Sequence, residues 1–377
     1  MGSIGVGAMK RRMIHALAAL VVAGCASGDE TLRFNTRDPG LQRSIRHWGI
    51  DLTWASPKNT RESVKNAGAE IDFVRIGFYM HEPLDDDGSL GDGQVRSLES
   101  ALRCARMIGE KVPVMMTPHN EAGIIDWYKN RDGSVRMDRW YQAMEKTRDW
   151  IVSQGHRVVV VEAFNEPDFK KWNMGIRKDL DELNKKLAAW KVIRVGPSTM
   201  STRWAKPWYD AASGNLDAGS THTLYGTMGE FVDFAKHVRD GRRRFFCPES
   251  HSIAEAMVGA EAGVEFVAWW AAVHEARGAF MRACQGKRLA YAAVEKNWSA
   301  GCVYRAPDGS LHGFVGSTER ENGRTTTYQF VCGNEDVTYH PDGDRTKGEF
   351  RKRGEGFAIT AKPEGGPISR WIEIVPK

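Results

Sequence analysis

Residues 158–169 read VVVVEAFNEPDF, and the character of the chain changes abruptly within this stretch. Four consecutive valines predict a strand that is buried on both faces, as the strands of a parallel sheet are. The strand then meets an amide, a carboxylate and a proline at Asn165, Glu166 and Pro167. In a barrel of parallel strands, functional side chains lie where each strand ends and its loop leaves the core. The stretch therefore predicts a central strand with a site at its carboxyl end, although it gives no reason for Glu162 within the strand.

Short apolar runs of this kind recur along the chain and alternate with helical patterns, for example at 95–109, 137–155 and 179–190. Eight such alternations over about 245 residues predict a closed (β/α)8 TIM barrel at residues 45–290. A doubly wound open sheet is the structural alternative, but it would normally carry a Gly-rich phosphate turn after an early strand, and the sequence shows none. The predicted strands are 47–56, 70–79, 111–119, 157–168, 192–200, 218–226, 243–251 and 263–270.

After about residue 290 the sequence pattern changes from alternating strands and helices to strands alone. WSAGCVYRAPDGSLHGFVGS, residues 298–317, reads as two alternating strands around a Pro-Asp-Gly turn, which predicts a hairpin. The runs 325–332 and 356–361 continue in the same style. We therefore expect residues 291–377 to form a small antiparallel, sandwich-like β-domain packed on the barrel.

The N-terminal residues resemble an export signal rather than part of the fold. A basic start at 10–12 precedes the short apolar run 13–24, which is too short to span a bilayer comfortably. Val22-Ala23-Gly24-Cys25 resembles the bacterial lipobox, which implies lipidation of Cys25; an ordinary signal peptide cut nearby is the alternative. We expect residues 1–25 to be this signal and 26–44 a polar tether. The protein would then be exported, either as a bacterial outer-membrane or cell-surface lipoprotein or into the periplasm, and would meet a membrane only through the lipid.

Charge and cysteine usage argue against several function classes. Removing residues 1–24 takes away three basic residues and no acidic one, which lowers the formal net charge from +5 to +2 and weakens any case for nucleic-acid binding. The five cysteines after Cys25 are odd in number and have no CxxC spacing, which disfavours a zinc module or a full disulfide framework. His119, His222 and His251 could converge on a metal, but the first strand carries only His47 where metal-dependent barrel hydrolases usually have His-x-His, so we expect neither a catalytic metal nor a cofactor.

Polar and aromatic side chains stand at the carboxyl end of most predicted strands, where a TIM barrel builds its active site. Two of them, Glu166 and Glu249, are carboxylates contributed by the fourth and seventh strands. The others could instead have structural roles. Arg75 could be an ion-pair partner and His119 a hydrogen-bonded core group, and the two tryptophans could belong to the core. The complete set is Arg75, His119, Asn165, Glu166, His222, Tyr225, Glu249, Trp269 and Trp270.

This set resembles the clan A glycoside hydrolases, which carry an Asn-Glu acid/base on the fourth strand and a Glu nucleophile on the seventh. FNEPD is the sharpest element of the resemblance, which covers roughly residues 45–290; the Cys-Pro-Glu-Ser context of Glu249 is less typical. The resemblance implies a retaining enzyme that cleaves β-linked poly- or oligosaccharides by double displacement, with Glu166 as acid/base and Glu249 as nucleophile.

The resemblance also implies roles for the remaining positions. Arg75 or Tyr225 would stabilise the charge of the nucleophile, and Asn165 would hydrogen-bond the sugar 2-hydroxyl. His119 and His222 would line the substrate site, and Trp269 or Trp270 would form an apolar floor under the sugar ring.

The loops near this end contain side chains suited to sugars and, less decisively, to acidic glycans: Trp127, Trp172, Trp204, Trp208, Lys170, Lys171, Arg203 and Lys206. The substrate could therefore be a sulfated or uronic glycan of algae or a neutral plant-type β-glycan. Two other functions remain open at this point: a non-catalytic carbohydrate-binding lipoprotein on a degenerate barrel, and an adhesion protein whose β-domain is the functional part. The sequence does not indicate an oligomeric state.

Overall fold

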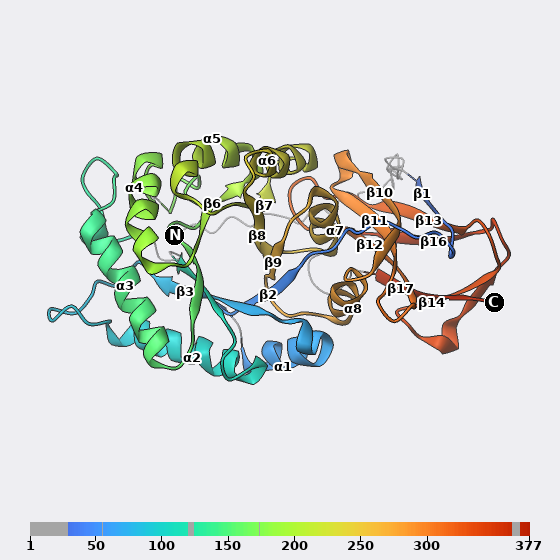
Figure 1. Ribbon diagram of the computed structural model, residues 1–377, viewed down its shortest axis with the longest axis horizontal. Helices are drawn as coiled ribbons and strands as arrows, with labels where there is room; N and C mark the ends of the chain where they lie inside the picture. Colours follow the sequence, from blue (N-terminus) through green and yellow to red (C-terminus); the bar gives the residue numbers. More distant parts are fainter. Residues whose placement is uncertain (1–28, 55, 120–123, 173, 364–369) are drawn as a thin grey trace, which may run out of the picture.

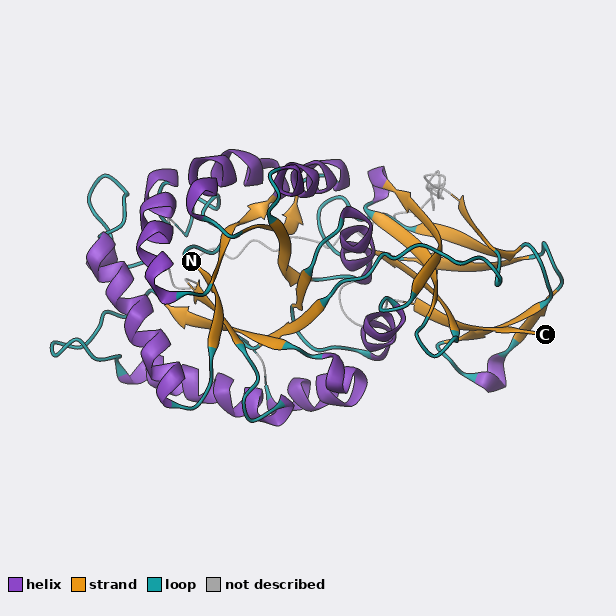
Figure 2. Ribbon diagram, in the orientation of Figure 1, coloured by secondary structure: helices purple, strands orange, loops and turns teal. Residues whose placement is uncertain are grey.

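The computed structural model describes residues 29–54, 56–119, 124–172, 174–363 and 370–377. The predicted signal and its lipidation residue Cys25 lie outside the described residues. Figure 1 shows two parts side by side, a ring of strands enclosed by helices and a smaller group of strands at the C-terminal end. The same division is visible in Figure 2, where helices surround only the first part.

The ring is a closed barrel of eight parallel strands, which confirms the predicted TIM-barrel fold. Closure comes from the pairing of the last strand with the first, from His47 opposite Phe266 to Ile50 opposite Trp269. The ring has no free edge, so its backbone groups are satisfied within the barrel. The strands are β2 (His47–Asp51), β3 (Phe73–Tyr79), β4 (Val114–His119), β5 (Val158–Glu162), β6 (Ile193–Ser201), β7 (Ala218–Tyr225), β8 (Arg244–Ser250) and β9 (Phe266–Trp269).

Eight helices follow the barrel strands and cover the outside of the ring. They are α1 (Pro57–Ala67), α2 (Asp92–Ile108), α3 (Met137–Ser153), α4 (Arg177–Leu187), α5 (Thr202–Ala212), α6 (Met228–Asp240), α7 (Ile253–Ala262) and α8 (Glu275–Ala283). Helix α7 has no polar face, and every residue from Ile253 to Ala260 is buried. It lies between the barrel and the β-domain, in contact with β8 on one side and with β11 and β12 on the other. A helix covered on both sides is largely apolar all round, and the buried carboxylate of Glu255 in α7 accepts a hydrogen bond from the amide of His251.

The interior of the barrel has an apolar layer below a polar one. Alternate residues of a strand point to the same side, so residues two apart stack along the barrel axis. On β3, Phe73 belongs to the apolar interior cluster and Arg75 lies above it; on β5, Val160 and Glu162 have the same relation. The apolar layer consists of Phe73, Met115, Val160, Val195, Ala218, Phe246, Phe266 and Ala268.

The C-terminal domain is built from two sheets that enclose a second core. The predicted hairpin is present, with β11 (Ser299–Arg305) and β12 (Leu311–Ser317) joined by a turn in which Gly309 has φ +88°. The larger sheet has the order β10-β11-β12-β17-β14-β15 and the smaller β1-β13-β16. The remaining strands are β10 (Lys287–Val294), β13 (Thr326–Cys332), β14 (Val337–Pro341), β15 (Glu349–Arg351), β16 (Gly356–Ala361) and β17 (Arg370–Pro376).

The segment predicted as a polar tether differs from that prediction. Strand β1 (Asp29–Phe34) pairs in parallel with β13, from Asp29 opposite Thr327 to Phe34 opposite Cys332. Leu32 and Phe34 are buried in the β-domain core. Their alternation with polar neighbours is a strand pattern, but it is too short to stand out from a polar segment. From residue 29 onward, the described part of the chain therefore runs from the β-domain into the barrel and back to the β-domain.

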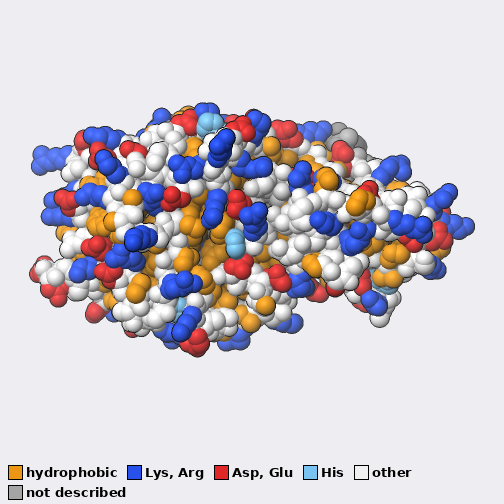
Figure 3. All heavy atoms as spheres, in the orientation of Figure 1, with side chains coloured by type: hydrophobic (Ala, Val, Ile, Leu, Met, Phe, Trp, Pro, Cys, Tyr) orange, Lys and Arg blue, Asp and Glu red, His pale blue; other side chains and the backbone are white. Residues whose placement is uncertain are grey.

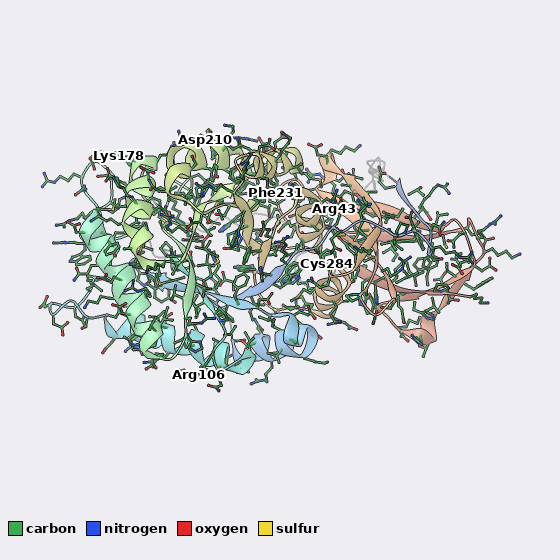
Figure 4. All side chains as sticks on the ribbon, viewed as in Figure 1. Arg43, Arg106, Lys178, Asp210, Phe231 and Cys284 are labelled. Carbon is green, nitrogen blue, oxygen red and sulfur yellow. The ribbon has the colours of Figure 1, made fainter. Side chains whose placement is uncertain are left out.

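The two domains share a packed interface. Figure 4 labels Arg43 and Cys284, which lie on the side of the barrel facing the β-domain. The Tyr304 hydroxyl donates to the carbonyl of Arg43 at 2.6 Å, and the Arg43 side chain pairs with Glu261 at 3.2 Å. The ring of Phe280 on α8 meets those of Tyr304 and Phe314 edge-on. The interface therefore combines aromatic packing with specific hydrogen bonds, which fixes how the β-domain sits on the barrel.

Three further observations bear on the function classes considered above. The five cysteines of the described residues are buried, and none of them forms a disulfide. Basic and acidic side chains are interspersed over the face drawn in Figure 3. Among the described residues, no helix combines the length and the apolar character needed to cross a bilayer.

Candidate active site

A cleft of about 520 Å³ opens at the carboxyl ends of the barrel strands. Each of the eight strands, or the loop that directly follows it, contributes to its lining. Those contributions are Asp51, Arg75, Thr117, His119, Asn165, Glu166, Met200, Leu224, Glu249 and Trp270. The cleft is therefore the place at which side chains far apart in the sequence meet.

Two carboxyl groups face each other in this cleft with an imidazole beside them. Carboxylate oxygens of Glu166 and Glu249 and a ring nitrogen of His222 all lie within 4.8 Å of one another. His222 Nδ1 is 2.8 Å from Glu166 Oε1 and 3.7 Å from Glu249 Oε2. In retaining glycosidases the two catalytic carboxyl groups lie about 5–5.5 Å apart, whereas inverting enzymes leave room for a water molecule between them. The spacing matches the retaining arrangement.

The backbone around Glu166 is held in an uncommon conformation. Glu166 has φ +52°, a region that non-glycine residues rarely adopt, and its amide donates to the carbonyl of Ser198 at 2.8 Å. Two residues later the carboxylate of Asp168 accepts from the amides of Met200 and Ser201 at 2.7 and 3.0 Å. These bonds fasten the loop after β5 to strand β6. Strained backbone held by its surroundings is typical of functional sites.

The environments of the two carboxyl groups shift their pKa values in opposite directions. Burial raises the pKa of Glu166 above its ordinary value of 4.5, and the hydrogen bond from His222 offsets only part of this effect. Burial alone would also raise the pKa of Glu249. There, however, the charge of His222, the hydrogen bond from His251 and the charge of Arg75 outweigh burial, and the pKa of Glu249 is well below its ordinary value. A carboxyl group that holds its proton more tightly than usual therefore lies beside one that loses its proton more readily, and pKa values pushed apart in this way are typical of sites that use one acid and one base.

Arg75 is the cation around which the acidic groups of the barrel interior are arranged. It is buried and pairs with Asp51, with Glu162 at 3.1 Å and with Glu249 at 3.1 Å. Its remaining nitrogen donates to the amide oxygen of Asn165 at 2.7 Å. This explains Glu162, which the strand pattern did not: it is a counter-ion of Arg75 and also accepts from the Ser198 hydroxyl. Three carboxylates share one guanidinium, so Glu249 is stabilised without being neutralised.

A loop of the β-domain reaches the same cleft. Residues 318–325 connect β12 to β13, and Arg320 in this loop lines the cleft. Its Nη2 lies 2.6 Å from His251 Nδ1, and His251 Nε2 lies 3.3 Å from Glu249 Oε1. The site is thus assembled from both domains.

Most of the residues proposed from the sequence meet in the cleft. Glu166, Glu249, Arg75, Asn165, His119 and Trp270 line it, and His222 contacts both carboxyl groups from the side. Burial lowers the pKa of His119 to about 4, so this ring is neutral at physiological pH.

Two of the proposed residues lie elsewhere. The side chain of Tyr225 is 49% exposed on the outside of the barrel, and Trp269 is buried between the strands and the helices, stacked on Trp48 with ring centroids 5.5 Å apart. The reason is strand alternation. Ala268 on β9 points inward, so Trp269 points outward and Trp270 points back towards the cleft. On β7 the inward set is Ala218, His222 and Leu224, which excludes Tyr225.

Sequence reasoning missed Asp51, Trp54, Thr117, His251 and Arg320 as members of the site. The same alternation would have found Thr117, two residues from Met115 in the apolar layer and two from His119. His251 follows Glu249 by two residues, but the sequence suggests it only as a possible metal ligand. Nothing local marks Arg320, because its position depends on how the β-domain docks.

Glu166, His222 and Glu249 are also the cluster of the described residues that could hold a metal ion. An ion there would compete with existing contacts. His222 Nδ1 already bonds Glu166, and the Arg75 guanidinium lies 3.1 Å from the Glu249 oxygen that would be a ligand. The positive charge of Arg75 next to that oxygen disfavours a cation at this position.

Known structures share this fold at low sequence identity. A GH30 endoxylanase from Clostridium papyrosolvens C71 matches with a TM-score of 0.60 and 14% identity, over 92% of this chain and 100% of that chain. An endo-β-1,6-glucanase matches with a TM-score of 0.51 and 10% identity, over 92% of this chain and 95% of that one. No protein-family model and no curated protein matches the sequence. At such identities the likeness establishes the fold, a (β/α)8 barrel with an attached β-domain.

Proposed function

We propose that this protein is a retaining glycoside hydrolase that cleaves β-linked poly- or oligosaccharides. The observation that carries the proposal is the pair of carboxyl groups within 4.8 Å at the mouth of the barrel, with the pKa of Glu166 raised and that of Glu249 lowered. The fold shared with a GH30 endoxylanase and an endo-β-1,6-glucanase is consistent with it.

In the first step the ionised carboxylate of Glu249 attacks the anomeric carbon while the carboxyl group of Glu166 gives its proton to the departing glycosidic oxygen. The products are a glycosyl ester on Glu249 and a leaving group that carries the Glu166 proton. Arg75 and His251, both in contact with Glu249, keep that side chain ionised and aimed before the attack.

In the second step Glu166, now ionised, takes a proton from a water molecule that attacks the same carbon and releases Glu249. Two inversions at one carbon give net retention. Asn165 is suited to bind the sugar 2-hydroxyl: Arg75 occupies its carbonyl oxygen, which leaves the amide NH2 as the donor for the cleft. Trp270 is suited to pack under the ring.

Basic side chains at the rim of the cleft are the feature that bears on whether the substrate is charged. Two basic side chains of the rim are neutralised by partners, Arg203 by Glu230 at 3.2 Å and Lys206 by Asp210. Trp172 lines the cleft, whereas Trp208 is buried. Lys170 and Lys171 are exposed, so the preference for a neutral β-glycan over a sulfated one rests on the paired Arg203 and Lys206 and on the aromatic lining.

The test is hydrolysis of a panel of neutral and sulfated β-glycans by the wild type and by Glu166→Gln. Glutamine keeps the size of the side chain but has no proton to give, so we expect turnover of natural glycans to fall by about 10²- to 10⁴-fold. The anomeric configuration of the first product, followed by proton NMR, should be that of the substrate. Equal activity of the two proteins would reject Glu166 as the acid/base, and an inverted product would reject the double displacement.

The same panel separates the non-catalytic alternative. A carbohydrate-binding lipoprotein on a degenerate barrel would bind one of the glycans, by isothermal titration, without releasing reducing ends. A protein whose function resides in the β-domain would neither hydrolyse the glycans nor lose glycan binding when the cleft is altered at Trp270.

Export remains part of the proposal, on the strength of the basic start, the apolar run 13–24 and the lipobox-like sequence ending at Cys25. Labelling with a fatty-acid analogue in a bacterial host should mark the wild type and not Cys25→Ser. Label on neither protein would support the ordinary signal peptide instead.

A further inference from the structure

We propose that Ser198, on the strand that follows the one leading to Glu166, is a positioning residue for the acid/base: it fixes the backbone from which the Glu166 side chain reaches the cleft. Ser198 is completely buried, so this role would not involve contact with the substrate. The proposal rests on the function proposed above and deepens it, because it names the residue that sets the geometry of the proton transfer.

Ser198 forms a bulge in β6. Pro197 of this strand is paired with Ser220 of β7, and Thr199 is paired with Thr221, so Ser198 is an extra residue between two consecutive pairs. Its φ of +52° lies in the left-handed region that non-glycine residues rarely adopt. Bulges are frequent next to active sites, where they redirect the groups of the bulged residue. The position of this bulge therefore calls for a functional explanation.

The bulge contacts the acid/base through the backbone. Regular pairing of β5 with β6 extends to Glu162 opposite Val195. Beyond it, the amide of Glu166 donates to the carbonyl of Ser198 at 2.8 Å, and both residues have φ +52°. A non-glycine residue keeps this conformation only where its surroundings hold it. The contacts that hold Ser198 should therefore also hold Glu166.

Three hydrogen bonds hold the bulge in place. The Ser198 hydroxyl donates to a carboxylate oxygen of Glu162 and lies 2.6 Å from the hydroxyl of Ser220. The amide of Ser198 donates to the same Ser220 oxygen at 3.1 Å. All three residues are completely buried. Loss of the Ser198 hydroxyl would leave buried polar atoms without a partner, and such a loss is not compensated by solvent.

Glu162 connects the bulge to the second carboxyl group of the pair. The Glu162 oxygen that does not bond Ser198 accepts from Arg75 at 3.1 Å, and Arg75 also donates to Glu249 at 3.1 Å. One guanidinium therefore holds Glu249 directly and Glu166 indirectly, through Glu162 and Ser198. The retaining mechanism depends on the separation of the two carboxyl groups. A misplacement of about 1 Å can lower the rate about 100-fold, so a residue that fixes this separation should affect catalysis.

The experiment measures kcat/KM of Ser198→Ala on two aryl glycosides of whichever sugar the panel identifies, one with an activated leaving group and one with a poor leaving group. A poor leaving group needs the proton of Glu166 to depart, whereas an activated one does not. We expect Ser198→Ala to lower kcat/KM about 10- to 100-fold for the poor leaving group and to stay within about threefold of the wild type for the activated one. A general loosening of the barrel would lower both values alike.

Thr199→Val is the matched control. Thr199 is the next residue of the same strand and is also completely buried, and its hydroxyl lies 2.9 Å from that of Thr221 on β7. The substitution removes a similar bond between the same two strands, so it should leave both glycosides unaffected. Ser220→Ala removes one partner of Ser198 and should reproduce the selective loss to a smaller extent. This variant decides the question if Ser198→Ala does not fold.

A second readout does not depend on activity. Amide hydrogen exchange, measured by mass spectrometry on a peptide that covers residues 163–169, reports how firmly the backbone around Glu166 is held. Exchange in this peptide should be slow in the wild type and in Thr199→Val, and faster in Ser198→Ala and Ser220→Ala. Peptides from the outer helices should exchange alike in all four proteins.

The outcomes are distinct. Equal losses on the two glycosides, or no loss on either, would overturn the proposal, and so would exchange at residues 163–169 that neither serine substitution changes. A selective loss of the same size in Thr199→Val would mean that the whole strand, rather than Ser198, positions Glu166. If the wild type hydrolysed no glycan, the proposed function would fail, whereas the exchange result would still decide whether Ser198 holds the backbone of Glu166.

Discussion

The lower and upper halves of the barrel interior are made by the same strands and have opposite chemistry. Phe73 and Val160 pack in the lower layer, and two residues further along their strands Arg75 and Glu162 form an ion pair. Two residues of strand span about 7 Å, so the change from close-packed hydrocarbon to a cluster of charges occurs within one layer of side chains. The apolar layer should determine how stably the barrel folds, and the polar layer what it can do. Substitutions in the two layers should therefore have separable effects.

The largest effect on chemistry with the least on folding is expected for Glu249→Gly in the upper layer. Removal of the proposed nucleophile should lower kcat about 10³-fold or more. Arg75 keeps Asp51 and Glu162 as partners, so the thermal unfolding midpoint should change little. Added azide should restore turnover and give a glycosyl azide of inverted configuration. A glycosyl ester trapped on another residue of the wild type would show that the nucleophile lies elsewhere.

The converse is expected in the lower layer for Phe246→Ala. The ring of Phe246 stacks on that of Phe266 with centroids 4.0 Å apart, and its loss leaves a cavity that the closed ring of strands cannot fill. The free energy of unfolding in denaturant should fall by about 3–5 kcal/mol. Activity per folded molecule should stay within about twofold of the wild type, since the site lies above this layer. A large loss of kcat in a well-folded variant would break the separation between the two halves.

The dependence of activity on pH should report on titratable groups of the upper layer, since the lower layer is apolar. Because Glu249 has a lowered pKa, it stays ionised at acidic pH, and kcat/KM should fall on the acid side only below the ordinary range of a glutamate. Because Glu166 has a raised pKa and must be protonated to act, kcat/KM should fall on the alkaline side as Glu166 ionises, about tenfold per pH unit. In Glu166→Gln, assayed with an activated aryl glycoside, the alkaline fall should disappear. An unchanged alkaline limb would assign it to another group.

The smallest effect is expected just outside the upper layer. Tyr225 is half exposed on the outer side of β7, so Tyr225→Ala should leave kcat/KM within about twofold and stability within about 0.5 kcal/mol. Trp270→Ala is the matched comparison, because Trp270 lines the cleft, and it should raise KM for oligosaccharides by about tenfold. Equal behaviour of the two variants would mean that strand alternation does not define the edge of the site.

The fold and the meeting of Glu166 and Glu249 in one cleft could be predicted because strands and their ends have local signals. Short apolar runs that end in polar residues mark barrel strands, and FNEPD marks one particular strand end. The residues that surround Glu166 and Glu249 are harder to predict, because the direction of each side chain has to be counted along its strand from the apolar layer. That count would have chosen Trp270 over Trp269, but it fails on β8, where the pairing register with β9 shifts between Cys247 and Ser250 and Glu249 departs from the alternation of Phe246.

The contributions from the β-domain have no signal of this kind. Arg320 stands 71 positions beyond Glu249 and acts through the docking of one domain on the other. The sequence predicts a tether where strand β1 lies, because a strand of six residues has too few apolar positions to reveal its periodicity. In both cases the deciding contacts join residues far apart in the chain.

The pairing of β1 with β13 bears on the order in which the molecule can be assembled. During synthesis the barrel segments emerge before the last strands of the β-domain, and domains generally fold as their residues become available. Strand β1, made among the first residues described, has to wait for a partner almost 300 positions later, with Leu32 and Phe34 uncovered in the meantime. Late pairings of this kind are intrinsically slow. The first described strand of the β-domain is thus synthesised early, and the domain is completed last. A ribosome-bound chain that already has a complete barrel would still hold an unpaired apolar strand that a chaperone could recognise.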